Sequence, residues 1–332
     1  MRRPLLGRTE ILVLAFSILA SAMNGVHAQP APAYPTKAVR LLVGNAPGGA
    51  SDILARVLAQ KLSEQWKGKS VVVENHAGAL GQLAVDMTVR AAPDGYTLLI
   101  PAATTLVVPM LQKKIPYDVR TALAPITELT TQMLVFLATR SLPVNSVQEL
   151  VTYAKGNPGT LNLGTSGAGS SGHAALALIN QGAGLDIQHV PFKGAAPSLQ
   201  ALVAGQIQLG ISSSIAGMPQ ARSGKAKALA VTGARRLQAF PDIPTLAESG
   251  FPGFEMTAWY GLYAPAGTPA DVITLLHRDV TKILGNPELQ SKLDGAEATP
   301  SASPIDLKNR LANEVTRWES LLKMPEFAAS MQ

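Results

Sequence analysis

The sequence predicts an α/β fold with two units, each built on a mainly parallel sheet flanked by helices. Short apolar runs alternate along the chain with amphipathic runs of helical period, and glycine-rich loops join them. The same alternation opens again at Met133–Ala138, which marks a second unit. With 332 residues, of which 47% are hydrophobic, the chain has enough apolar material for two cores.

The N-terminal 28 residues have the three parts of a secretory signal peptide. Three arginines precede an apolar core at Ile11–Ala20, and small residues end the segment at Ala28. The apolar core is too short to span a bilayer comfortably, so a membrane anchor is the less favoured alternative. We therefore expect cleavage after Ala28 and a mature chain that begins at Gln29.

The composition excludes several classes of partner. The chain has no cysteine, so its cores must stabilise it without disulfides. The net charge is only +6, and the basic residues form no cluster larger than an adjacent pair such as Arg235-Arg236, so we expect no nucleic-acid partner. The five histidines show no metal-ligand spacing, so we expect no metal site and no cofactor.

The first unit begins after a tether rich in proline and alanine. Its elements are expected in this order: a buried strand at Val39–Val43, a helix with an apolar face at Ile53, Leu54, Val57, Leu58, Leu62 and Trp66, a strand at Val71–Glu74, a helix ending near Ala91, and a strand at Tyr96–Ile100. The loops GNAPGGASD and NHAGALG follow the first two strands. This order of strands and helices is typical of a mainly parallel sheet.

The second unit has the same alternation of strands and helices. Ser146 and Glu149 form a capping box for its first helix, and Gly156 is placed to terminate that helix. Its elements are expected in this order: a strand at Met133–Ala138, a helix ending at Lys155, a strand at Thr160–Leu163, a helix through Asn180, a strand at Ile187–Pro191, a helix at Leu199–Ala204, and strands at Gln208–Ser212 and Lys227–Thr232.

The last part of the chain, from Ala258, contains a strand-like segment, WYGLYAP, and then helices. The final helix starts at Ser303-Pro304, a favoured helix start. One apolar face of this helix consists of Leu307, Leu311, Val315, Trp318 and Leu322. Two α/β units and a helical C-terminus predict a bilobed protein.

One glycine-rich stretch, GTSGAGSSGHAA at residues 164–175, has the pattern G-x-G-x-x-G from Gly167 to Gly172. A dinucleotide site would place an acidic residue at the end of the following strand. Asp186 instead precedes the strand expected at Ile187–Pro191, and the pattern comes late in its unit. A dinucleotide site is therefore disfavoured.

The same stretch could hold the nucleophile of a serine hydrolase. That class needs G-x-S-x-G, whereas the segment around Ser166 lacks the last glycine. His173 and His189 are close in sequence, but no acidic residue follows His173 at useful spacing. Because the members of a triad can lie far apart in sequence, an exported hydrolase stays open as a less favoured alternative.

A third interpretation needs no catalysis. Loops rich in glycine, serine and threonine at helix N-termini offer N–H groups and hydroxyls to an anion. Such loops occur at Asn45–Ser51, Asn75–Gly81, Thr165–Ser171 and Lys193–Ser198, two in each unit. Because these loops gather at the carboxyl ends of parallel strands, we expect two facing units to form an anion-binding cleft.

Eight segments follow one another along the chain: YPTKAVRLLVGNAPGGASDILARVLAQKL, VVVENHAGALG, APDGYTLLI, IPYDV, LNLGTSGAGSSGHAA, VPFKGAAPSLQALVAGQI, FPDIPTLAESGFPGFE and WYGLYAPAGTP. In this order they resemble the segments of one known family, the substrate-binding proteins of tripartite tricarboxylate transporters, also called the Bug family. The resemblance implies a two-lobed periplasmic binding protein of type II, a Venus flytrap. It places residues 29–132 and 256–332 in the first lobe and residues 133–255 in the second.

The resemblance also implies a set of ligand-binding residues in the four loops. They are Asn45, Gly48, Gly49 and Ser51 in the first loop, Asn75, Ala77 and Gly78 in the second, Thr165, Ser166, Gly169 and Ser170 in the third, and Phe192 and Lys193 in the fourth. Asp52 is expected to cap a helix instead of contacting an anion. Asn45 stands where the family usually has an aromatic residue, so the resemblance leaves the particular carboxylate open.

The function implied by the resemblance is capture of a small carboxylate in the periplasm, without catalysis, and its delivery to the membrane subunits of a transporter. We expect the protein to act as a monomer. A ligand-sensing module for a two-component system would have the same fold and ligand, so it remains an alternative beside the exported hydrolase.

Overall fold

The computed structural model describes residues 34–286, 296–298, 301–329 and 331. The chain divides into two units, Met1–Thr36 and Lys37–Gln332. The predicted signal peptide, with its cleavage after Ala28, lies outside the described residues. None of the described helices is long and apolar enough to cross a membrane.

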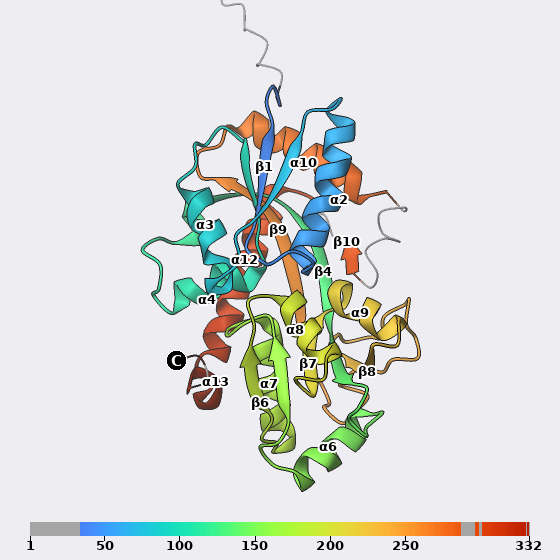
Figure 1. The fold of residues 1–332 in the computed structure, drawn as a ribbon. Helices are drawn as coiled ribbons and strands as arrows, with labels where there is room; N and C mark the ends of the chain where they lie inside the picture. Colours follow the sequence, from blue (N-terminus) through green and yellow to red (C-terminus); the bar gives the residue numbers. More distant parts are fainter. Residues whose placement is uncertain (1–33, 287–295, 299–300, 330, 332) are drawn as a thin grey trace, which may run out of the picture. The chain divides into compact units, whose positions relative to one another are not determined.

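The unit Lys37–Gln332 alternates strands and helices along most of its length (Figure 1). Its described strands are β1 Val39–Val43, β2 Val71–Asn75, β3 Thr97–Ile100, β4 Leu123–Thr139, β5 Asn162–Thr165, β6 Gln188–Pro191, β7 Leu209–Ser213, β8 Ala226–Val231, β9 Thr257–Pro265 and β10 Ala296–Ala298. Its described helices are α2 Ala50–Gln65, the 3-10 turn η1 Ala79–Gly81, α3 Gln82–Val89, α4 Ala103–Leu111, α5 Val119–Ala122, α6 Val147–Gly156, α7 Ser171–Ala183, α8 Ala195–Val203, α9 Ser214–Arg222, α10 Ala270–Leu284, α12 Pro304–Leu321 and α13 Pro325–Ala329.

The sheet is mixed, with the order β2-β1-β3-β9-β4-β7-β5-β6. Strand β1 pairs in parallel with β2 and β3, and β5 pairs in parallel with β6 and β7. The long strands β4 and β9 pair antiparallel to each other and to their neighbours. The first lobe is thus built on β1–β3 with β9, and the second on β5–β8.

Strand β4 belongs to both lobes, and Figure 1 shows it beside β9. From Leu123 to Met133 it pairs with β9, and from Leu134 to Thr139 it pairs with β7 and β8. The partner changes between Met133, which faces Thr257, and Leu134, which faces Ser213. The chain therefore passes from one lobe to the other inside a continuous strand. The lobe boundaries predicted from the sequence stay a prediction.

Most elements expected from the sequence form close to their expected bounds. Ser146 caps α6 as expected, because its Oγ accepts from the N–H of Glu149 at 3.1 Å. The second bond of the expected capping box differs, because Glu149 accepts at 2.7 Å from the N–H of Asn145, the residue before the cap, instead of from that of Ser146. Ser303 likewise caps α12, with Pro304 as its first residue. Local sequence signals thus fix where these helices start.

Several elements differ from the expectation. Strand β4 begins at Leu123, well before Met133, and the helices α4 and α9 were not expected. Both helices contain an internal proline, Pro109 and Pro219, which interrupts the helical pattern in the sequence. They form because most of their residues are buried and tertiary packing outweighs the propensity.

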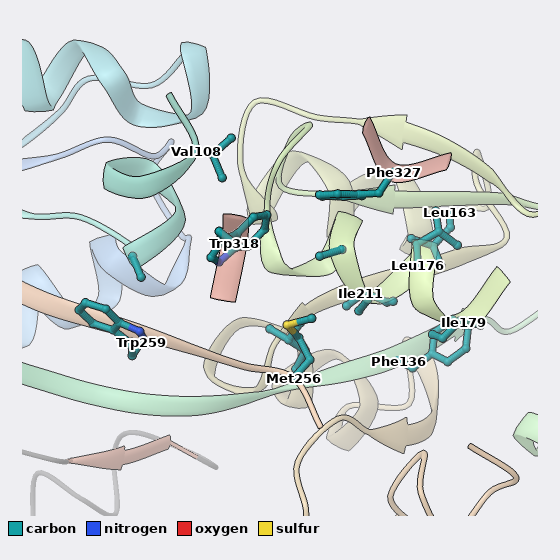
Figure 2. Close-up of a cluster of buried hydrophobic side chains, with 14 of the residues drawn as sticks. Val108, Phe136, Leu163, Leu176, Ile179, Ile211, Met256, Trp259, Trp318 and Phe327 are labelled. Atoms are coloured by element: carbon teal, nitrogen blue, oxygen red, sulfur yellow. The ribbon is translucent and has the colours of Figure 1, made fainter. Parts of the chain in front are cut away.

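One large apolar core continues through both lobes and under the C-terminal helices (Figure 2). Trp259 of β9, Trp318 of α12 and Phe327 of α13 are each at most 2% exposed. The rings of Trp318 and Phe327 lie 6.0 Å apart, and Phe327 also contacts His173 of α7 at 5.0 Å. The C-terminal helices therefore pack against residues of both lobes.

Candidate ligand-binding site

The starts of five helices meet at one small cavity of about 50 Å³, here called the inner cavity. Each of these helices follows the carboxyl end of a strand, namely β1, β3, β5, β6 or β7. The inner cavity is lined at these helix starts by Ala50 of α2, Ala102, Thr104 and Thr105 of α4, Ser170, Ser171 and Gly172 of α7, Ala195 of α8, and Ser212 and Ser213 of α9. This is the edge of an α/β sheet where ligands bind.

The inner cavity attracts negative charge without a cation. The described residues that line it include no charged side chain. The first N–H groups of a helix have no partner inside the helix, and the helix dipole adds about half a positive charge there. Tyr260 also lines the inner cavity, and burial raises the pKa of its phenol to about 12, so it stays protonated at neutral pH. The lining therefore offers donors to an anion.

The hydrogen bonding of two serine hydroxyls also indicates that the inner cavity binds a polar ligand. Ser212 and Ser213 are 6% and 7% exposed, and their Oγ atoms have no hydrogen-bond partner within the described chain. Both residues line the inner cavity. Buried hydroxyls are almost always hydrogen-bonded, because leaving one unpaired costs about 1–3 kcal/mol. A polar ligand in the inner cavity would supply the missing partners.

A larger cavity of about 470 Å³, here called the outer cavity, adjoins the inner one. The two share Asn45, Leu80 and Ser166 in their linings. Apolar side chains form much of the outer wall: Leu80, Val108, Pro109, Ile115 and Phe192. Its two lysines, Lys114 and Lys193, are exposed. The outer cavity is thus mainly apolar inside and basic where it meets solvent.

A buried carboxylate organises the loop between β1 and α2. Asp52 accepts from the N–H of Gly48 at 2.9 Å, from Asn75 Nδ2 at 3.0 Å and from Arg56 at 3.0 Å. Burial alone would raise the pKa of Asp52, but hydrogen bonds from Arg56, Gly48 and Asn75 outweigh it and lower the pKa. Asn75 also donates to the carbonyl of Asn45 at 3.0 Å. Asp52 therefore ties two of the predicted anion loops together.

Two stacked histidines support the glycine-rich loop before α7. The rings of His173 and His189 lie 3.8 Å apart and nearly parallel. His173 Nδ1 accepts from the N–H of Gly169 at 3.1 Å, and His189 Nε2 lies 2.7 Å from Thr165 Oγ1. Burial lowers the pKa of His173 to about 3, with a further contribution from His189, and burial lowers the pKa of His189 to about 4. Both rings are neutral at pH 7, and they support the loop through these contacts with Gly169 and Thr165.

The structure separates the predicted ligand-binding residues into three groups. The first group lines the inner cavity: Asn45, Ser166 and Ser170. The second lines the outer cavity: Asn45, Gly78, Ser166, Phe192 and Lys193. The third lines neither: Gly48, Gly49, Ser51, Asn75, Ala77, Thr165 and Gly169.

Several residues of the third group already form hydrogen bonds within the protein. The N–H of Gly48 and the side chain of Asn75 bond to Asp52, and the N–H of Gly169 bonds to His173. Ser51 Oγ accepts from Asn45 at 2.8 Å. These contacts show how the loops are held in place. A direct contact of these residues with a ligand stays a prediction.

Sequence reasoning missed the starts of α4 and α9 and one of the three residues that both cavities share. At these places the missed lining residues are Ala102, Thr104, Thr105, Ser212, Ser213 and Leu80. Hydroxyl residues directly after a buried strand were the available signal, at Thr104-Thr105 and at the run Ser212–Ser214. Neither helix was recognised, so the signal was not used.

The geometry gives a hydrolase little support. Ser166 lines both cavities, and no hydrogen bond joins it to a histidine among the described residues. The two nearby histidines, His173 and His189, face Gly169 and Thr165 instead. Within the described part of the chain, no group of three histidine or acidic side chains could hold a metal ion.

Comparisons with known proteins agree with this geometry. The model of the tripartite tricarboxylate transporter family receptor matches residues 54–326. The chain is 33% identical to Protein BugT of Bordetella pertussis over 95% of this chain and 97% of BugT. The two sequences are thus similar along almost their entire lengths.

Solved structures extend the likeness to the fold. A Rhodopseudomonas palustris protein with adipate is 34% identical, with a TM-score of 0.82 over 87% of this chain and 97% of that protein. MatC from the same species, with bound malate, is 32% identical, with a TM-score of 0.80 over 87% of this chain and 100% of MatC. The family match, the relative and the two-lobed fold agree: the chain belongs to the tripartite tricarboxylate transporter receptor family of solute-binding proteins.

Proposed function

We propose that this protein captures a small carboxylate between its two lobes and delivers it to the membrane subunits of a tripartite tricarboxylate-type transporter. It does so as a monomer, without catalysis and without a cofactor. The observation that carries the proposal is the meeting of five helix starts at the inner cavity. Beside them lie the hydroxyls of Ser212 and Ser213, which have no hydrogen-bond partner in the described parts of the chain. That lining suits an anion, and the two similar proteins named above hold adipate and malate.

In this proposal the protein works in the periplasm after removal of residues 1–28, with cleavage after Ala28. The first lobe comprises residues 29–132 and 256–332, and the second comprises residues 133–255. The change of partner strand inside β4, at Met133 and Leu134, supports a hinge at this boundary.

The ligand would be enclosed when loops from the two lobes meet. A Cβ built at Gly194 of the second lobe would lie 3.5 Å from the backbone nitrogen of Ala46 in the first. A Cβ built at Gly48 would lie 3.5 Å from Cβ of Ala196. These contacts support a closed arrangement in which helix starts from both lobes face one ligand. A carboxylate that bridges them would favour this state over an open one.

A thermal-shift panel of malate, adipate and hexanoate tests the proposal. A ligand at 100 times its Kd stabilises the folded protein by about 2.7 kcal/mol, which would raise the Tm by several degrees. The matched control is sodium chloride at equal ionic strength, which should leave the Tm nearly unchanged. If no acid of the panel, and no wider set of carboxylates, raises the Tm, the proposed function is wrong.

A further inference from the structure

The main unexplained feature near the site is the backbone of the loop between β2 and α3. Four consecutive residues have positive φ: Gly78 at 123°, Ala79 at 46°, Leu80 at 56° and Gly81 at 86°. Glycine adopts this conformation readily, whereas leucine is rare there because its Cβ is crowded. A strained leucine persists only where its surroundings require it, and such positions gather at binding sites.

Leu80 lies where the two cavities and the two lobes meet. It lines both the inner and the outer cavity. Its two methyl carbons would lie 3.6 Å and 3.5 Å from Cβ atoms built at Gly167 and Gly169, which belong to the glycine-rich loop of the second lobe. The leucine therefore presents an apolar surface at the passage between the cavities.

The outer cavity continues this apolar surface away from the helix starts. Val108 is 2% exposed and Pro109 is buried, while Ile115 and Phe192 are half-buried. Apolar walls of this kind gain free energy when an apolar group displaces water, and they disfavour a group that needs hydration. A ligand that reaches from the inner to the outer cavity must place its body against them.

The lysines of the outer cavity offer little to a second carboxylate. Lys114 and Lys193 are exposed, so solvent screens them and an ion pair with either would contribute weakly. A second carboxylate near Leu80 or Val108 would lose hydration. The buried amide of this lining, Gln82, already donates its N–H groups to Asp86 and Tyr117, so it offers no donor in exchange. The charge pattern thus favours a ligand with its single charge at the helix starts.

We propose that the ligand is a monocarboxylate with an apolar body, whose carboxylate occupies the inner cavity and whose body occupies the outer cavity, and that Leu80 determines this specificity. The proposal rests on the proposed function and deepens it. It distinguishes this site from one for compact, polar di- or tricarboxylates.

Hexanoate, adipate and malate separate these classes in calorimetric titrations of the mature protein. Hexanoate and adipate have the same chain length and differ only in whether a methyl or a second carboxylate ends the chain. We expect hexanoate to bind at least about tenfold more tightly than malate, and adipate to bind no more tightly than hexanoate. Tighter binding of malate or adipate would overturn this inference and leave carboxylate capture standing. Failure of every carboxylate to bind would overturn both.

Leu80→Asn tests the specificity residue, because asparagine has nearly the shape of leucine and tolerates positive φ. We expect hexanoate to bind about tenfold more weakly to this variant, malate to change little, and the Tm to stay the same or rise. The matched control is Leu83→Asn, since Leu83 is 50% exposed on α3 and lines neither cavity. An unchanged ratio of hexanoate to malate affinity in Leu80→Asn would overturn the assignment.

A second variant keeps the test valid if Leu80→Asn does not fold. Ile115→Asn changes the outer cavity from a different loop, where the side chain is half-buried. It should lower the affinity for hexanoate and leave that for malate nearly unchanged. Equal losses for both acids would contradict an apolar subsite.

Discussion

Two residues at the end of β7, Ser212 and Ser213, carry buried hydroxyls that have no hydrogen-bond partner among the residues that the structure describes. Anion binding explains these unpaired hydroxyls, because a carboxylate accepts hydrogen bonds from hydroxyls. Their position at the start of α9 adds the N–H groups of that helix to the same side. A purely structural role would normally give such hydroxyls an internal partner.

Ser213→Ala should therefore weaken ligand binding without destabilising the fold. A hydrogen bond to a charged group contributes about 1.5–3 kcal/mol, so we expect the affinity to fall about 10- to 100-fold. The matched control is Ser249→Ala, because Ser249 Oγ donates to the carbonyl of Thr245 at 2.7 Å. That control should lower the free energy of unfolding by about 1 kcal/mol and leave the affinity unchanged. The reverse pattern in calorimetry and urea unfolding would contradict the assignment of Ser213.

The stacked histidines predict a loss of stability in acid. The pKa values of His173 and His189 are about 3 and about 4, both below the ordinary value of 6.5. Because these folded-state pKa values are lowered, the unfolded chain binds protons first as the pH falls. Stability should be complete above about pH 6.5 and decline as the pH falls towards 4 and then 3.

Urea unfolding at pH 7.5 and pH 5 measures this effect. His173 is 1% exposed and should cost on the order of 2 kcal/mol at pH 5, while half-buried His189 should add less. Replacing His173 with Asn and His189 with Gln should make the free energy of unfolding less dependent on pH between 7.5 and 5. This holds whatever the replacements do to the stability at pH 7.5. A double variant as sensitive to acid as the natural protein would show that other groups carry the effect.

At the scale of elements, β4 joins the two lobes as one continuous strand and contains the point at which we propose a hinge. Its partner changes from β9 to β7 and β8 between Met133 and Leu134. Thr232, which follows β8, braces this point because its Oγ1 accepts from the N–H of Leu134 at 2.9 Å and donates to the carbonyl of Met256. Thr232 is fully buried. It thus connects the segments on which a hinge would depend.

Thr232→Val keeps the shape of the side chain and removes these hydrogen bonds. The N–H of Leu134 loses a buried acceptor, so we expect the free energy of unfolding to fall by about 1–3 kcal/mol. Thr121→Val on the exposed helix α5 serves as the comparison and should change it by no more than about 0.5 kcal/mol. Equal stabilities of the two variants in urea unfolding would show that the brace contributes nothing.

The helices and strands also show which parts of the fold can be predicted from the sequence alone. Strand β1 and the cap of α6 were predicted where they form, because a short apolar run and a capping residue are local properties of the chain. Helices α4 and α9 were missed, because Pro109 and Pro219 break their patterns and burial stabilises them. The length of β4 was also missed, since pairing with β9 depends on residues far along the chain.

The candidate site divides in the same way. The four glycine-rich loops were found from composition, and Asn45, Ser166 and Ser170 line the inner cavity. Which donors remain free was not predictable, because the N–H of Gly169 is taken by His173, and that contact depends on tertiary structure. The role of Leu80 also required the backbone angles, since no pattern in the sequence marks a leucine with positive φ.

At the scale of the whole unit Lys37–Gln332, these features form one arrangement. Strands from both lobes end at one place, and the helices that follow them begin there. Loops from the two lobes approach each other closely beside it, at Gly48 and Gly194. A charged ligand held there by neutral donors would join the lobes without any lysine or arginine in the described lining of the inner cavity.

The central claim is that helix starts and hydroxyls hold the charge of a carboxylate. Calorimetric titration of the mature protein with the tightest-binding acid of the panel and with its primary amide tests this claim most directly. The amide lacks the charge and points an NH₂ group at groups that can only donate, so the mismatch should cost on the order of 2–4 kcal/mol. We predict that the amide binds about 30- to 1000-fold more weakly than the acid. Equal affinities of the acid and the amide would contradict the account.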